Sequence, residues 1–143
     1  MNFVLDASVT MSWLLADAKP IDNRYAGSVL ASLAGNDTTA GVPVIWSLEV
    51  ANVVARAEAK GLVTEAQSEA FLEMLAGIHI RPDAATFPRA FVETLSLARR
   101  YRLSSYDASY LELALRLGLP LATLDSSLLK AAKKAGINRF LMT

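Results

Sequence analysis

Residues 103–134 read LSSYDASYLELALRLGLPLATLDSSLLKAAKK, and this stretch decides the fold. A serine at 104 or 105 is a preferred N-cap for a helix that Gly118 ends. Residues 119–124 (LPLATL) then have the composition of a buried strand, and residues 125–136 that of a second helix. Because helical crossovers join parallel strands, this order predicts a parallel sheet covered by helices.

The rest of the chain shows the same alternation of short apolar runs and longer amphipathic segments. Glycine, proline and capping residues mark the ends of the segments, for example the Thr64 and Gln67 pair of a capping box. The sequence therefore predicts an α/β fold with helices on both faces of the sheet. Strands are expected at 2–6, 39–42, 78–81 and 119–124, with an edge strand at 137–142, and helices at 7–16, 22–33, 45–60, 64–76, 86–102, 104–117 and 125–136.

Length and composition indicate a globular chain. The 143 residues are expected to form a single domain, 1–143, and a hydrophobic content of 53% excludes a disordered chain. No uninterrupted apolar run approaches the roughly 18 residues that a membrane span requires. The first residues lack a basic segment and place Asp6 where a signal peptide would be apolar, so export is not expected. The expected location is the cytoplasm.

The residue types exclude several kinds of site. The chain has no cysteine and one histidine, His79, which excludes disulfides, thiolate zinc sites and multi-histidine metal sites. Only oxygen ligands remain for a metal ion. Fourteen acidic residues balance fourteen basic ones, so binding to nucleic acid must depend on local patches.

Four carboxylates stand alone in apolar stretches. A buried carboxylate without a partner costs several kcal/mol or takes up a proton. Because each stretch also lacks a local lysine or arginine, the simplest common explanation is that the four converge on one divalent cation site. The stretches are residues 1–16 around Asp6, 40–55 around Glu49, 103–111 around Asp107 and 117–129 around Asp125.

The expected positions of these acids agree with one site. Asp6 and Asp125 each follow a predicted strand, and ligands of open α/β sheets bind outside the carboxyl ends of the strands. Asp107 falls in the first turn of its helix, and Glu49 lies on a helix that can pack beside it. An all-oxygen site suits Mg²⁺ or Mn²⁺ better than zinc, and such ions assist phosphodiester hydrolysis. Nearby hydroxyls that could orient the acids belong to Ser8, Thr123 and Ser126.

The ordered set FVLDASV, WSLEVANVV, LSSYDASYLELA and LATLDSSL resembles the PIN domain, and specifically its VapC-like toxin branch. The resemblance covers essentially the whole chain. It implies a three-layer sandwich with a parallel sheet of about five strands, and a metal-dependent ribonuclease that acts as the toxin of a type II toxin-antitoxin pair. It also implies an RNA substrate, a homodimer and inhibition by a VapB-like antitoxin. By position, Asp6, Glu49, Asp107 and Asp125 would be the catalytic and metal-binding residues, Asp6 and Asp107 above all as ligands.

Other interpretations of the same acids stay open at this point. Asp6 or Asp125 alone would serve as a helix N-cap, and Glu49 would serve as one half of a structural salt bridge. Two classes are excluded: a receiver-type signalling domain needs adjacent acids near the first strand and a lysine after a late strand, and neither is present, and a haloacid-dehalogenase-like phosphatase needs an aspartate where Ser8 stands. The remaining alternative is a catalytically silent PIN-fold module that binds a partner protein.

Charged and aromatic residues outside the four acids have simpler interpretations. Glu112 and Arg116 are spaced i,i+4, so we expect a surface helix pair outside the site. His79, Trp13 and Trp46 are expected in packing roles. Two basic runs would either contact RNA phosphates or complement the dipoles of helix ends, namely residues 99–102 (RRYR) and the lysines 130, 133 and 134.

Overall fold

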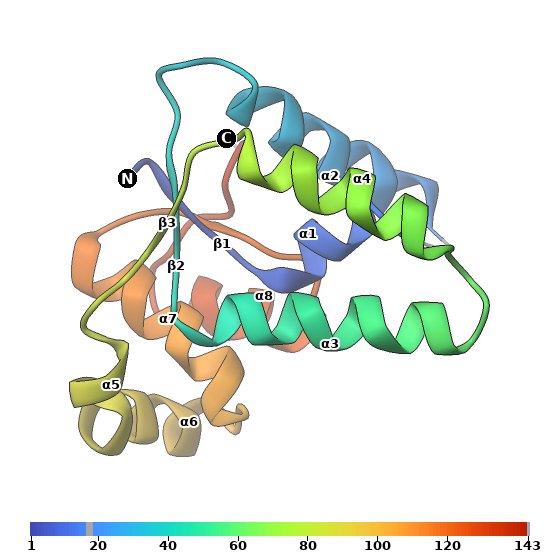
Figure 1. Cartoon of the computed structure of the whole chain (residues 1–143). Coiled ribbons are helices and arrows are strands. Elements are labelled where there is room, and N and C mark those ends of the chain that lie inside the picture. Colours follow the sequence, from blue (N-terminus) through green and yellow to red (C-terminus); the bar gives the residue numbers. More distant parts are fainter. Residues whose placement is uncertain (17–18, 143) are drawn as a thin grey trace.

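The computed structural model describes residues 1–16 and 19–142. The described residues form a four-stranded parallel sheet in the order β3-β2-β1-β4 (Figure 1). Its strands are β1 (Phe3–Leu5), β2 (Ala40–Val42), β3 (Ile80–Pro82) and β4 (Leu121–Ala122). The helices are α1 (Ala7–Ser12), α2 (Pro20–Leu33), α3 (Ile45–Ala59), α4 (Glu65–Ala76), α5 (Thr86–Arg89), α6 (Leu95–Tyr101), α7 (Ser105–Leu117) and α8 (Ser126–Lys134), with a π-helical turn, η1 (Ala90–Thr94).

Helices cover both faces of the sheet, because every residue of β1 is buried and successive side chains point to opposite faces. Phe3 and Leu5 pack with α2, and Val4 packs with α7 and α8 on the other face. A third apolar cluster joins α1, α3 and α4. The predicted three-layer α/β sandwich with a parallel sheet is therefore confirmed.

The expected edge strand at 137–142 is the main difference from the sequence-based prediction. Within the described residues, this segment pairs with the sheet only through a bridge between Leu121 and Arg139. The ring of Phe140 stacks on Phe3 with 3.8 Å between ring centroids. Leu141 then takes a φ of 66°, a left-handed conformation that a β-strand does not allow. The sheet consequently has four strands and not about five.

Helix boundaries also differ in places. The helix expected at 7–16 ends at Ser12, and the one expected at 86–102 is interrupted by η1. Pro88 lies in the first turn of α5, two residues before η1, where a missing backbone N–H is tolerated.

The expected caps are present. Thr64 and Gln67 form the reciprocal capping box of α4, and Ser104 caps α7. No helix within residues 1–16 and 19–142 is long and apolar enough to span a bilayer. The assignment of residues 1–143 to one domain stays a prediction.

Candidate active site

Asp6 lies directly after β1, at the carboxyl end of the sheet. Its backbone N–H donates to the carbonyl of Ala122, so the ends of β1 and β4 are tied together at this point (2.9 Å). The residue is only 4% exposed. Its Oδ2 accepts hydrogen bonds from the hydroxyls of Ser8 (2.6 Å) and Thr123 (2.8 Å). These two hydroxyls fix the carboxylate but bring no positive charge.

The electrostatic surroundings of Asp6 oppose its ionisation. Burial raises the pKa of its carboxyl to about 6, although the hydrogen bonds from Ser8 and Thr123 act in the opposite direction. The negative charges of Glu49 and Asp125 raise the pKa further. Asp6 is thus a buried acid in the field of other acids, which is the situation that the isolated carboxylates of the sequence predicted.

Asp107 occupies the first turn of α7, where its backbone N–H donates to Ser104 Oγ (3.0 Å). Burial raises the pKa of its carboxyl to about 6, and the charges of Asp6 and Asp125 add to this effect. Its carboxylate accepts no hydrogen bond from any residue that the structure describes. The side chain is therefore available to a ligand beside Asp6.

Glu49 approaches the same site from α3. Its Oε1 accepts a hydrogen bond from the hydroxyl of Tyr110 on α7 (2.7 Å). Burial raises the pKa of Glu49, Tyr110 lowers it, and the charge of Asp107 raises it. The sequence-based analysis did not identify Tyr110, although it follows Asp107 by three residues on the same helix face and is fully buried. Burial, followed by the charge of Asp6, raises the pKa of Tyr110, so its hydroxyl stays a donor.

Asp125 caps a helix and also acts electrostatically on the other acids. It is the N-cap of α8, because its Oδ1 accepts from the backbone N–H of Leu128 (3.0 Å). Its charge also acts on Asp6 and Asp107. Asp125 therefore caps α8 and also lies near the other acids. The cap uses Oδ1, and Oδ2 takes no part in it.

The neighbouring hydroxyls divide into two groups. Ser8 and Thr123 both contact Asp6, and Thr123 Oγ1 also accepts from the backbone N–H of Asp125 (3.0 Å). Ser8 Oγ accepts from the backbone N–H of Leu124 (3.0 Å). Ser126 is exposed, and its hydroxyl makes no hydrogen bond within the described part of the chain. This hydroxyl therefore does not orient the acids.

The donor chemistry of this acid cluster (Asp6, Glu49, Asp107 and Asp125) fits a hard divalent cation. All its ligand atoms are carboxylate oxygens, and no described lysine or arginine forms a salt bridge with any of the four. Among residues 1–16 and 19–142, no group of three or more acidic or histidine side chains is placed to hold a metal ion directly. Mg²⁺ does not need such a group, because it usually keeps several waters and binds one or two carboxylates. The residues present therefore suit Mg²⁺ or Mn²⁺.

Glu112 is not the surface residue expected from the sequence. It is 4% exposed, and its carboxylate accepts from Arg116 Nε (2.7 Å). Arg116 also binds Asp83, which follows β3, through a 2.6 Å contact. Arg89 Nε lies 3.6 Å from Glu112 Oε1. The expectation of a surface pair was wrong, because η1 packs against both α5 and α7 and Glu112 lies among these elements. The exclusion of Glu112 from the acid cluster agrees with its contacts to Arg89 and Arg116.

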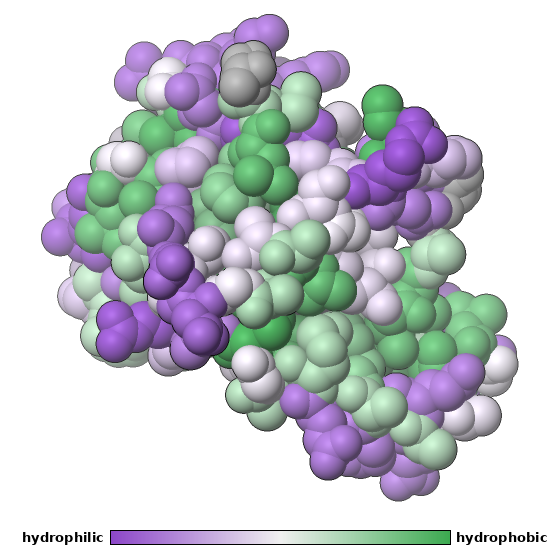
Figure 2. All heavy atoms as spheres, turned by 90° about the horizontal axis from the view of Figure 1, so that it is seen from above, coloured by the Kyte–Doolittle hydropathy of each residue, from purple (hydrophilic) through white to green (hydrophobic). Residues whose placement is uncertain are grey.

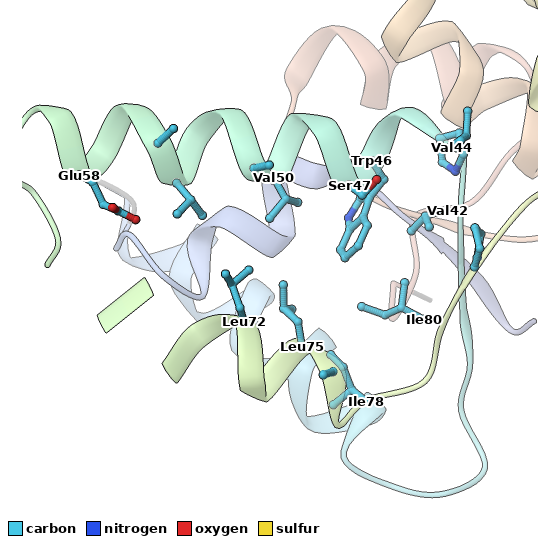
Figure 3. A pocket seen from close by; sticks show the side chains of 16 residues that line it. Val42, Val44, Trp46, Ser47, Val50, Glu58, Leu72, Leu75, Ile78 and Ile80 are labelled. Atoms are coloured by element: carbon cyan, nitrogen blue, oxygen red, sulfur yellow. The ribbon is translucent and has the colours of Figure 1, made fainter. Parts of the chain in front are cut away.

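A large apolar groove lies away from the acid cluster. It measures about 680 Å³ and runs between α3 and α4 to the ends of β2 and β3 (Figure 3). Val50, Leu72, Leu75, Ile78 and Ile80 point into it, and none of the four acids lines it. Figure 2 shows apolar atoms open to solvent between hydrophilic rims on the face seen from above. Its lining is mainly apolar, with Ser47 and Glu58 as the polar exceptions.

The fold is a parallel α/β sandwich with a cluster of carboxylates toward the carboxyl edge of its sheet. The chain belongs to the PIN domain family, which matches residues 3–134.

The comparison with solved structures agrees on the fold. The crystal structure of PAE2754 from Pyrobaculum aerophilum is similar, with a TM-score of 0.66 and 21% sequence identity over 92% of this chain and 86% of that chain. A search of curated protein sequences finds no match.

Proposed function

We propose that the protein is a Mg²⁺-dependent endoribonuclease that hydrolyses phosphodiester bonds of RNA, with Mn²⁺ as a substitute ion. The observation that carries the proposal is the buried carboxylate of Asp6, held by two hydroxyls at the carboxyl end of the sheet with no described cation beside it. Membership of the PIN family supports it, because these domains are typically metal-dependent nucleases.

The proposed roles follow from the contacts of each acid. Asp6, Asp107 and Asp125 would hold the ion, directly or through waters that Mg²⁺ keeps, with Ser8 and Thr123 fixing the orientation of Asp6. A bound Mg²⁺ supplies charge neutralisation at the phosphate and lowers the pKa of a coordinated water. Glu49 has one oxygen engaged by Tyr110, which leaves the other to orient the attacking water or to contact a second ion. The same four residues are therefore proposed as both catalytic and metal-binding residues.

We further propose that the protein is the toxin of a VapBC-type pair, acting in the cytoplasm as a homodimer and inhibited by a VapB-like antitoxin. Exposed apolar surface supports a protein partner. The groove between α3 and α4 is one such surface, and Phe87 and Phe91 form another, with exposed fractions of 88% and 90%. A monomer without partners would leave both surfaces in water.

A catalytically silent PIN-fold interaction module is the second candidate. It is favoured by the same groove and by the lack, among the described residues, of three acidic or histidine side chains placed to hold a metal ion directly. The two candidates differ in whether the acid cluster turns over substrate, so an RNA cleavage assay separates them.

The test is cleavage of RNA with Mg²⁺ and with EDTA, for wild type, Asp6→Asn and Asp107→Asn. An exposed acid away from the cluster, Asp37, provides the matched control Asp37→Asn. The ribonuclease proposal expects cleavage that requires Mg²⁺, is lost in both cluster variants and is retained in the control. Cleavage that persists in EDTA or in both cluster variants would refute it.

The toxin proposal has its own test. Expression of the wild type should arrest growth, co-expression of the product of the neighbouring gene should restore it, and Asp107→Asn should be harmless. Growth that is unaffected by an active ribonuclease would refute the toxin role but not the activity.

A further inference from the structure

The two basic runs of the sequence, far apart along the chain, meet at one polar hollow of about 330 Å³. Arg100 and Arg102 line it from the end of α6 and the residue that follows, and Lys130 and Lys134 line it from α8. Tyr101 and Ser127 complete this basic pocket. The sequence left open whether these cations bind RNA or only complement helix dipoles.

The cations of the basic pocket have no acidic partners. All four are exposed, and none forms a salt bridge with any described acid. Arg89 and Arg116, in contrast, are engaged by Glu93, Glu112 and Asp83. Four like charges around one hollow repel each other, and a bound anion would relieve this repulsion.

Helix dipoles do not explain why these particular cations face each other. Arg99 and Arg100 both lie in the last turn of α6, and Lys133 and Lys134 both lie in the last turn of α8. Only Arg100 and Lys134 of these pairs line the pocket. Either member of each pair would complement the helix dipole equally well. The dipoles therefore do not account for which cations line the pocket.

The elements that carry the basic pocket lead to two acids of the acid cluster. Asp125 caps the helix that carries Ser127, Lys130 and Lys134, and the helical rise places the two lysines about 7 and about 13 Å further along its axis. On the other side, Arg102 is two residues before Ser104, which caps the helix of Asp107. A nucleic-acid strand with one phosphate at the acids would place the following phosphates along this row.

We propose that the basic pocket binds the phosphate groups of single-stranded RNA next to the bond that is cut. Lysine and arginine bind phosphates without reading bases, so the pocket would position the strand and not select its sequence. Tyr101, with the Arg100 guanidinium 5.6 Å from its ring centroid, offers an aromatic surface for one base. The inference rests on the proposed ribonuclease function, because RNA is the phosphate-bearing substrate considered there.

Binding in EDTA tests the pocket without any cleavage. The probe is a 12-nucleotide single-stranded RNA with a fluorescein label, followed by fluorescence anisotropy over a series of salt concentrations. The pocket variant is Arg100→Gln with Lys134→Gln, and the matched control is Arg99→Gln with Lys133→Gln. Both double variants remove two charges from the same last turns of α6 and α8, so the change in net charge is equal.

We expect the pocket variant to bind the RNA about tenfold more weakly, and its salt slope to fall by about 1.4, which is 0.7 for each lost phosphate contact to a single strand. The control should change affinity less than about twofold. Equal losses in both variants would overturn the inference. Tighter binding of an oligoglutamate peptide than of the RNA, lost only in the pocket variant, would assign the pocket to an acidic protein partner and also overturn it.

Failure of this inference is distinguishable from failure of the ribonuclease proposal. If the wild type does not cleave RNA but the two double variants differ in binding, the ribonuclease proposal fails and the pocket remains a nucleic-acid site. If the wild type cleaves RNA and the two variants bind equally, the pocket assignment alone is wrong.

Discussion

Two groups of buried and half-buried acids in this protein have opposite surroundings. Glu112 and Asp83 share the guanidinium of Arg116, with contacts of 2.7 and 2.6 Å. Asp6, by contrast, is held by hydroxyls and lies in the field of Glu49 and Asp125. A buried carboxylate that the chain itself neutralises stabilises the fold, whereas one that the chain leaves charged and unpaired destabilises it unless a ligand binds.

The pKa directions express the same difference. Burial raises the pKa of Asp83, but the hydrogen bonds and charge of Arg116 outweigh it and hold the pKa below its usual value. Burial and neighbouring acids raise the pKa of both Asp6 and Asp107 to about 6. We therefore interpret the Asp83–Arg116–Glu112 group as structural and the acid cluster as a cation site.

The largest expected effect is on catalysis. Asp6→Asn and Asp107→Asn each remove a proposed metal ligand while preserving side-chain size, and we expect kcat to fall on the order of 10³-fold. The measurement is single-turnover RNA cleavage with saturating Mg²⁺. A loss below tenfold in both variants would remove the distinction between the two groups of acids.

Neutralising the structural group should affect stability instead. Arg116→Met leaves Glu112 and Asp83 without their shared cation, and we expect the free energy of unfolding to fall by about 3 kcal/mol. Denaturant unfolding followed by circular dichroism measures this change. An unchanged midpoint would show that the Arg116 contacts contribute no net stability.

In the acid cluster, removing a charge should raise the free energy of unfolding instead of lowering it. Without a divalent ion, Asp6→Asn removes a buried charge, so we expect the variant to be more stable than wild type by about 1 to 3 kcal/mol at pH 7.5 in EDTA. The same denaturant experiment measures it. A destabilised Asp6→Asn protein in EDTA would mean that the carboxylate is compensated after all.

The pH dependence follows from the raised pKa of Asp6. Between its unfolded value of 3.8 and its folded value of about 6, the folded protein binds more protons than the unfolded chain. The free energy of unfolding in EDTA should therefore decrease as pH rises through this window, by up to about 3 kcal/mol for this group. Adding Mg²⁺ should stabilise the protein more at pH 7.5 than at pH 5. Thermal unfolding at both pH values, with and without Mg²⁺, checks the sign.

The smallest expected effect concerns Tyr110. Tyr110→Phe removes the donor that orients Glu49 but keeps the buried ring, so kcat should fall about tenfold while KM for RNA stays unchanged. Stability should change by about 1 kcal/mol. A change confined to KM would place Glu49 in substrate binding and not in orienting the attacking water.

The sequence predicted what depends on local pattern. The strands ending at Asp6 and before Asp125, and the caps at Thr64 and Ser104, all follow from apolar runs and capping residues read a few positions at a time. The gathering of the acids followed from one general rule, since parallel strands end at one edge of the sheet.

Features that depend on distant packing were not predictable in this way. Glu112 is buried by segments whose relative placement no local pattern specifies, and the hydrogen bond from Tyr110 to Glu49 joins residues 61 positions apart. The strand expected after residue 136 was replaced by aromatic stacking of Phe140 on Phe3, another long-range contact. The two basic runs likewise line one pocket only because distant segments pack together.

Calorimetric titration with Mn²⁺ tests the central claim most directly, because it measures cation binding without RNA. The account predicts a binding isotherm for wild type and for Asp37→Asn, and at least tenfold weaker binding for Asp6→Asn and Asp107→Asn. Absence of binding to the wild type, or equal binding to all four proteins, would contradict the assignment of the acid cluster as a cation site.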